Sequence, residues 1–280
     1  KLIVKEVFKT EQRPEKKITL DFEHTLSMSA LKFLQQSLRT LYEVILKISK
    51  ELFSNEYYKI KPQIFRLHTW VGYDVDGRGD IFWNDSFSKR LEVKIGQLVL
   101  YSNSIDIILK KCRDKHLNKE LSKIKLSLME SIKCNSIALK KFSQKGFVED
   151  FSSIKKVSNF LHKNRKKLLT NTEPIIAHLN SLIENIIKKK NASDKKQIDD
   201  LIILKIEIMN FGLGLGRTHL RLNANQLNNA ISKEIDLSGD PNDPSNKRTY
   251  LSIISRMIDK VKPAKINFGS IYEENMNARR

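Results

Sequence analysis

Cysteine is nearly absent from this chain, since only Cys112 and Cys134 occur in 280 residues. They fall in separate helical patterns, and neither has further ligands at the spacing of a zinc site. A disulfide framework is therefore excluded, and free thiols of this kind favour an intracellular, cytoplasmic protein.

Long hydrophobic runs are missing as well. Hydrophobic residues make up 40% of the chain, an ordinary share. No run approaches the roughly 18 apolar residues that a membrane-spanning helix needs. The sequence thus predicts no insertion into a membrane.

Acidic residues are too few to balance the basic ones, because 32 Asp and Glu stand against 51 Lys and Arg, a net charge of +19. The lysines, often paired as in Lys140-Lys141, are spread over the polar faces of all the helical patterns. We interpret them as solvated faces, and a nucleic-acid footprint is the alternative. The positive field would favour an anionic substrate in either case.

Apolar residues at helical spacing dominate the rest of the chain, which predicts a mainly α fold. The predicted helices cover residues 28–54, 88–114, 118–145, 150–168, 172–186, 193–210, 224–234 and 244–262. In the first of them an apolar seam is expected to pack in the core; it consists of Leu31, Leu34, Leu38, Leu41, Ile45, Ile48 and Leu52. We find no repeat and no linker, so we expect one domain over 1–280. Because the chain begins with Lys1 and ends with Arg280, we expect an internal fragment of a larger protein.

One loop, residues 69–80, interrupts the helices and holds three glycines and closely spaced carboxylates. An apolar run over 62–67 precedes it and predicts a buried strand. A calcium loop is excluded by spacing, because Gly72 and Trp83 would occupy the positions that require carboxylates. A plain strand-to-helix turn stays open as an interpretation of the loop. His68 beside it is interpreted as a packed or hydrogen-bonded core histidine, with a catalytic role as the alternative.

A second glycine-rich segment, Gly212-x-Gly214-x-Gly216, follows the helix that ends near residue 210. It lies after a helix and before a strand, the reverse of the dinucleotide-binding context, so that function is rejected. Alternation over residues 217–222 predicts a short strand with Arg217, His219 and Arg221 on one face. These groups suit an anion, because arginine binds phosphate or carboxylate bidentately. A surface strand paired to acidic neighbours is the alternative.

The two segments together resemble the phosphoenolpyruvate carboxylase family. The first is similar to that family's Trp-Met/Ile-Gly-Gly-Asp-Arg-Asp-Gly-Asn-Pro motif, with matches at Trp70, Gly72, Asp74, Asp76 and Gly77. The second is similar to Phe-Gly-Val-x-Leu-Val-Arg-Leu-Asp-Ile-Arg-Gln-Glu, and both arginines match, at Arg217 and Arg221. The departures include Tyr73, Val75, Arg78, His219, Leu222 and Asn223. They indicate a divergent branch.

The resemblance implies a mainly helical fold around part of a (β/α)8-type barrel, with both motifs adjoining at its mouth. It implies formation of oxaloacetate and phosphate from phosphoenolpyruvate and bicarbonate with Mg²⁺ or Mn²⁺, and a homo-oligomer, as the family forms tetramers. Arg221 is then the expected contact to the anionic reactants, and Arg217 supports it. Asp74 and Asp76 would shape the loop, and Arg78 could replace the arginine that Val75 displaces.

Other parts of the family pattern are missing from this sequence. The segment with the catalytic histidine, the metal carboxylates and the Gly-Arg-Gly-Gly loop have no counterpart here. We therefore expect the fragment alone to be inactive, with the metal ligands outside it. A basic helical module that binds nucleic acid or another partner without catalysis is the alternative function.

Salt dependence separates these two interpretations. If the lysines are solvated helix faces, the chain should bind duplex or single-stranded nucleic acid only weakly and without sequence preference at 200 mM salt, because phosphate contacts lose affinity steeply with salt. Fluorescence anisotropy with labelled oligonucleotides measures this. Tight, saturable binding at that salt concentration would favour the nucleic-acid module.

Overall fold

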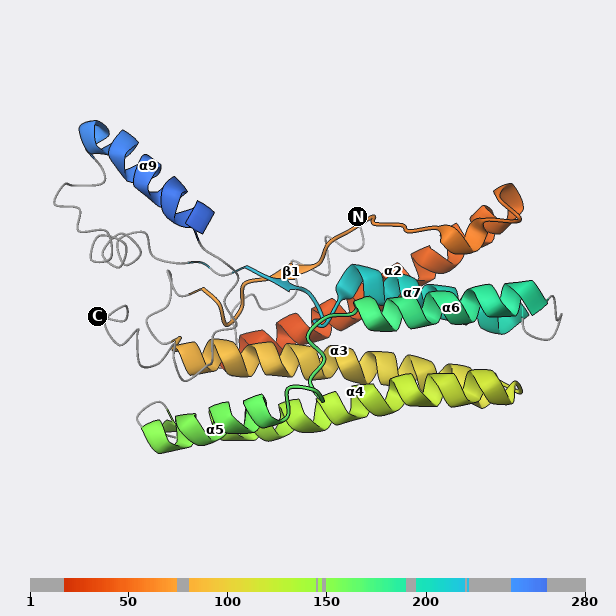
Figure 1. Ribbon diagram of the computed structural model, residues 1–280, viewed down its shortest axis with the longest axis horizontal. Helices are drawn as coiled ribbons and strands as arrows, with labels where there is room; N and C mark the ends of the chain where they lie inside the picture. The colour runs from red at the N-terminus through yellow and green to blue at the C-terminus, as the bar shows by residue number, and fades with distance from the viewer. Residues whose placement is uncertain are drawn as a thin grey trace, which may run out of the picture.

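The computed structural model describes residues 18–74, 81–144, 146–147, 150–189, 195–219, 221 and 243–260 (Figure 1). The α-helices of these residues are α2 (Leu20–Leu52), α3 (Trp83–Lys111), α4 (Lys115–Phe142), α5 (Phe151–Lys163), α6 (Glu173–Lys189), α7 (Lys195–Phe211) and α9 (Pro244–Lys260). A short 3-10 helix, η1 (Tyr57–Lys59), and two strands, β1 (His68–Thr69) and β2 (Arg217–Thr218), complete them. The predicted mainly α fold is confirmed. These strands form one two-stranded sheet, and the described residues contain no barrel.

The helices form two antiparallel pairs that stack on each other. In Figure 1, α3 and α4 run side by side, α6 and α7 form a second pair, and α5 folds back along α4. Helix α7 also packs against α2 and α3, while α9 lies apart from this bundle. Five helices, α3 to α7, separate the two strands in the sequence, as the helical periodicity indicated.

The helices begin where polar side chains satisfy free backbone N–H groups. The hydroxyl of Thr19 accepts a hydrogen bond from Phe22 N at 3.2 Å, so α2 starts eight residues before the predicted position. The Asp114 carboxylate accepts from Leu117 N at 3.0 Å and caps α4 in the same way. Such caps stabilise a helix by about 1 kcal/mol each.

Helix α7 lies at the centre of the core. Every residue from Leu201 to Ile208 is buried, so this helix has no solvated face over two turns. The buried set includes Lys205 and Glu207. A helix that is enclosed on all sides needs neighbours on all sides, and α2, α3 and α6 supply them.

The predicted apolar seam of α2 is only partly correct. Leu31 and Leu38 are buried, but Leu34, Ile48 and Leu52 are 49%, 48% and 69% exposed. The face that points inward is instead made of His24, Leu31, Gln35, Leu38, Tyr42, Leu46 and Ser49. The helix is rotated relative to the prediction because polar side chains on it have buried partners, which a count of apolar spacings does not detect.

The predicted buried strand at 62–67 is wrong. Residues 63–66 are exposed, and the ladder begins only at His68. The segment runs over the surface from η1, anchored where Asn210 Nδ2 donates to Pro62 O at 2.9 Å. No helix among the described residues is long and apolar enough to span a lipid bilayer.

Helix α4 offers a matched test of this packing. Leu121 is fully buried, while Leu126 on the same helix is 63% exposed. We expect Leu121→Ala to lower the free energy of unfolding by about 2–5 kcal/mol through lost contacts and a residual cavity. Leu126→Ala should change it by less than about 0.5 kcal/mol. Urea unfolding followed by circular dichroism measures both, and similar losses for the two variants would contradict the assignment of this face.

Candidate functional site

The two glycine-bearing segments meet as a pair of parallel strands. In the register of β1 and β2, His68 lies opposite Arg217 and Thr69 opposite Thr218. Arg217 N donates to Leu67 O at 2.8 Å, and His219 N donates to Thr69 O at 2.9 Å. Parallel neighbours need a long crossover, and helices α3 to α7 provide it. The expectation that the two segments adjoin is confirmed.

The pairing resumes beyond β1 and β2. Arg221 N donates to Tyr73 O at 3.0 Å, and Asp74 lies opposite Arg221 in an isolated parallel bridge. Their side chains also meet, with Arg221 Nη1 3.5 Å from Asp74 Oδ2. The Arg221 side chain stays 59% exposed, whereas that of Asp74 is 19% exposed. The carboxylate therefore contacts one nitrogen of a guanidinium whose side chain stays largely in solvent.

A turn separates the two paired stretches on the β1 side. Tyr73 N donates to Trp70 O at 2.8 Å and closes the turn, and Gly72 has a φ of +88°. Only glycine adopts this backbone conformation without strain. The motif's glycine thus reverses the chain so that Asp74 returns to the ladder opposite Arg221.

Hydroxyl groups fix this turn to the helices below it. The Thr69 hydroxyl accepts from Val71 N at 3.3 Å and lies 3.0 Å from the Ser27 hydroxyl of α2. Ser86 at the start of α3 donates from its hydroxyl to Gly72 O at 2.7 Å. Both helices therefore contribute to the position of the turn.

Beneath the turn lies a buried lysine with an acidic partner on each side. Lys89 is 7% exposed, and its Nζ lies 2.5 Å from Asp21 Oδ1 and 3.4 Å from Glu92. His24 Nδ1 adds a contact to Glu92 at 3.2 Å. Burial alone would raise the pKa of Glu92, but the bond to His24 and the charge of Lys89 hold that pKa below its usual range. Hydrogen bonding to Lys89 likewise lowers the pKa of Asp21.

The glycine-rich segment of the second motif is held at two carbonyl groups. Tyr101 donates its hydroxyl to Gly212 O at 2.8 Å, just after α7 ends. Gln35 Nε2 donates to Leu215 O at 2.9 Å and to Gln97 Oε1 at 2.7 Å. Sequence reasoning missed these glutamines, because a polar pair that joins two helices has no local signature.

The predicted site residues are brought together as far as the structure describes them. Gly72, Asp74, Arg217, His219 and Arg221 all lie on the paired segments, and Trp70 is 55% exposed in the turn. The predicted residues Asp76, Gly77 and Arg78 lie outside the described residues.

His68 is not a core histidine, which corrects the interpretation made from the sequence. Its side chain is exposed, and its ring centroid lies 4.5 Å from that of His219. Loss of water contact, then the charges of His219, Arg217 and Arg66, lower the pKa of His68. Arg66 was missed as a site residue, because it lies before β1 in a segment with no strand pattern of its own.

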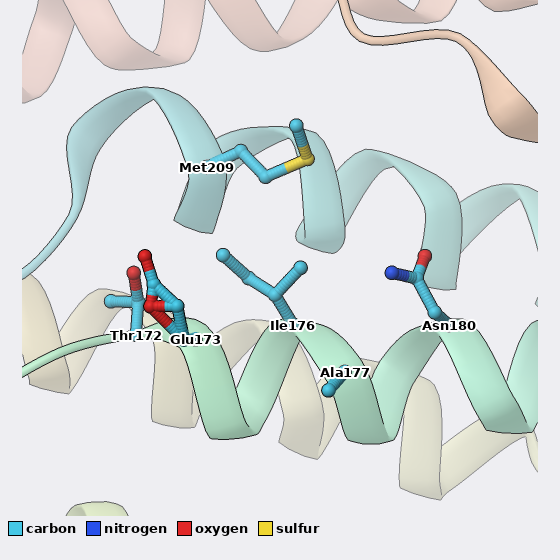
Figure 2. Close-up of a pocket in the computed structure, with 6 residues that line it drawn as sticks. All are labelled: Thr172, Glu173, Ile176, Ala177, Asn180 and Met209. Carbon is cyan, nitrogen blue, oxygen red and sulfur yellow. The ribbon is translucent and has the colours of Figure 1, made fainter.

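The described residues hold no group of three or more His, Cys, Asp or Glu side chains that could bind a metal ion. A cavity of about 460 Å³ opens between α6 and α7, lined by Thr172, Glu173, Ile176, Ala177, Asn180 and Met209 (Figure 2). Its charged lining residue is an acid, so it does not suit an anionic substrate. The paired segments are the better candidate site.

Comparison of the chain with protein-family models, with curated proteins and with solved structures finds no match. The site is therefore interpreted from its own residues and from the resemblance of the two motifs.

Substitution of two glycines tests whether Lys89 constrains the turn at Gly72. An added Cβ at Gly72 would lie 2.9 Å from Lys89 Cγ, whereas one at Gly212, with a φ of +61°, meets nothing within 4 Å. Gly212→Ala should therefore lower the free energy of unfolding by about 1–2 kcal/mol from backbone strain alone. Gly72→Ala should cost roughly 1–3 kcal/mol more, because the packed lysine must also move. Urea unfolding measures both losses, and equal values would show that Lys89 does not constrain the turn.

Proposed function

We propose that this chain is part of a phosphoenolpyruvate carboxylase, which forms oxaloacetate and phosphate from phosphoenolpyruvate and bicarbonate. One observation carries the proposal. The two segments that resemble that family's motifs lie in parallel register, and the matched Asp74 and Arg221 contact each other. A shared site of the two motifs requires such a contact, and the pairing supplies it.

Arg221 is the proposed contact to the anionic reactants. Its guanidinium is planar and carries five donors, of which Asp74 engages one edge at 3.5 Å. The exposed donors remain available for a phosphate or carboxylate group. As the phosphoryl group moves to bicarbonate and an enolate develops, a cation already held in place stabilises the growing negative charge.

Arg217 in β2 supports Arg221. It lies four residues before the isolated Asp74–Arg221 bridge and is exposed. Asp74 shapes the turn and orients the arginine, and Trp70, Gly72 and His219 complete the surroundings of the site. In the proposed fold, β1 and β2 are neighbouring strands of a (β/α)8-type barrel, whose functional loops follow the carboxyl ends of the strands.

Mg²⁺ or Mn²⁺ would supply further neutralisation of charge to such an enzyme, but the described residues do not offer a fitting set of ligands. The proposal therefore assigns the metal to other carboxylates of the complete enzyme. A cytoplasmic homo-oligomer belongs to the same proposal.

A basic helical interaction module without catalysis is the second candidate. The observation that favours it is the outward face of α2, where Phe22, Leu26 and Phe33 are 48%, 54% and 67% exposed. A face of this kind marks a contact surface, either to another protein or to further parts of the same one.

Substitution of Arg221 in the complete gene product tests the enzyme proposal. We expect Arg221→Ala to lower kcat/KM by roughly 10²-fold or more, because a preorganised electrostatic contact is lost. Arg221→Lys should recover only part, since lysine offers a point charge instead of a planar fork. Oxaloacetate formation, coupled to malate dehydrogenase, reports the rate.

Arg165, an exposed residue after α5, provides the matched control, and Arg165→Ala should leave the rate unchanged. Circular dichroism should report an intact fold for all variants. A folded Arg221→Ala protein with full activity would remove this residue from the mechanism. A complete gene product that forms no oxaloacetate from phosphoenolpyruvate would overturn the enzyme proposal itself.

A further inference from the structure

Four basic side chains gather on the solvent face of the β1–β2 pair. Arg66 and His68 are two residues apart in one segment, and Arg217 and His219 are two apart in the other. Side chains at that spacing share a strand face. Arg66 precedes β1 and His219 follows β2, and both lie close enough to His68 for their charges to act on it. All four residues are exposed, whereas Thr69 is buried and Thr218 half-buried on the opposite face. We call these four residues the basic ribbon face.

The members of the basic ribbon face are close enough to repel one another. His68 lies opposite Arg217 in the register, and the His68 and His219 rings are 4.5 Å apart. Loss of water contact lowers the pKa of His68 first, and the charges of His219 just after β2, of Arg217 in β2 and of Arg66 before β1 lower it further. Among the described residues, no carboxylate forms an ion pair with any of the four. Like charges on directly opposed strand positions are destabilising.

We propose that the basic ribbon face is a binding site for a small tetrahedral dianion, namely a phosphate group, and that it takes up protons as the anion binds. Two guanidiniums offer bidentate donor pairs to phosphate oxygens. Two imidazoles add donors that become cationic on protonation. The bound dianion replaces mutual repulsion with attraction to all four groups.

The inference goes beyond the proposed carboxylation. It shares Arg217 with the proposed enzyme site, but it needs only the geometry of the strand pair and no turnover. The contact between Arg221 and Asp74 takes no part in it. It would therefore stand even if the complete gene product formed no oxaloacetate.

Proton uptake follows from the lowered pKa of His68. Loss of water contact lowers the pKa of His68 most, and the charges of His219, Arg217 and Arg66 lower it further. A bound dianion favours the charged imidazole and raises the pKa. By reciprocity, the anion binds more tightly as the pH falls through the titration of the imidazoles.

Sulfate is the sharpest probe, because it stays doubly charged from pH 5.5 to pH 8 and so isolates the titration of the protein. NMR titration of the imidazole carbons in the 280-residue chain should show that saturating sulfate raises the pKa of His68 by roughly one unit. His116 and His162, exposed on α4 and α5, should shift far less. The Kd for sulfate should be about tenfold lower at pH 5.5 than at pH 8, at ionic strength held constant with chloride.

Substitutions in the basic ribbon face test whether its four side chains bind the sulfate. Arg66→Gln and Arg217→Gln should each raise the Kd for sulfate about tenfold or more, while Arg113→Gln, an equal charge change at an exposed residue between α3 and α4, should change it less than twofold. His68→Gln and His219→Gln should flatten the pH dependence. Because the exposed side chains make no packing contact in the core, circular dichroism should show unchanged folds.

Competition identifies the source of the phosphate group. If phosphoenolpyruvate reverses the change that sulfate causes in the His68 signal, the site binds the phosphate group of the substrate. If only inorganic phosphate reverses it, the site binds free phosphate. Either result supports the proposal. The proposal would be overturned if sulfate raised the pKa equally for His68, His116 and His162. It would also be overturned if Arg113→Gln raised the Kd for sulfate as much as the other arginine variants, because both results would indicate a general effect of positive charge. Displacement of sulfate by oligonucleotides alone would also overturn it, in favour of a nucleic-acid surface.

Discussion

The burial of α7 is the constraint on which the rest of the described structure depends. A helix with no solvated face can exist only if other helices enclose it, and α2, α3 and α6 do so. Its two buried charges fix its rotation. Glu207 accepts two hydrogen bonds from Arg39 of α2, at 2.9 and 3.0 Å, and Lys205 donates to Tyr58 O at 2.7 Å. Burial raises the pKa of Glu207 and lowers that of Lys205, so both charges depend on these partners.

The position of α7 also places the second motif beside the first. Gly212, with its positive φ, ends α7, and Gly212 N donates to Ile208 O at 3.0 Å. Gly216 then passes so close to Leu67 O that an added Cβ would lie 3.3 Å from it. The glycines of this segment therefore let a chain leaving the core come alongside β1, where the backbone of Arg217 can pair. The arrangement of the site is thus a consequence of how α7 is enclosed and how it ends.

Helices were the part of the fold most open to prediction, because apolar spacing and capping residues are local signals. Even so, α2 began earlier than expected, and its inward face was rotated toward Gln35 and Tyr42. The error has a physical cause: Gln35 is buried because it bonds to Gln97 and to Leu215 O, and a partner 180 positions away leaves no trace in the local pattern. The buried Lys89 beneath the turn was unpredictable for the same reason.

The site itself was predictable only where two motifs could be matched in order. The two segments were expected to adjoin because of that match, since nothing in either segment alone specifies a partner; the pairing of Asp74 with Arg221 was not predicted. The exposure of His68 was missed because the short apolar run before it suggested a buried strand, whereas residues 63–66 of that run are exposed. A strand of two residues is too short for an alternation of apolar and polar residues to be recognised in the sequence.

The two positive regions of the paired segments differ in how their charge is held. Arg221 has a carboxylate beside it, because its Nη1 lies 3.5 Å from Asp74 Oδ2. The basic ribbon face has no such counter-charge among the described residues, and its two imidazole rings lie 4.5 Å apart. The departure from the resembled motif contributes to this difference, because His219 stands where the family pattern has an acid. An acid at this position would add a negative charge to a face that, among the described residues, carries basic side chains alone.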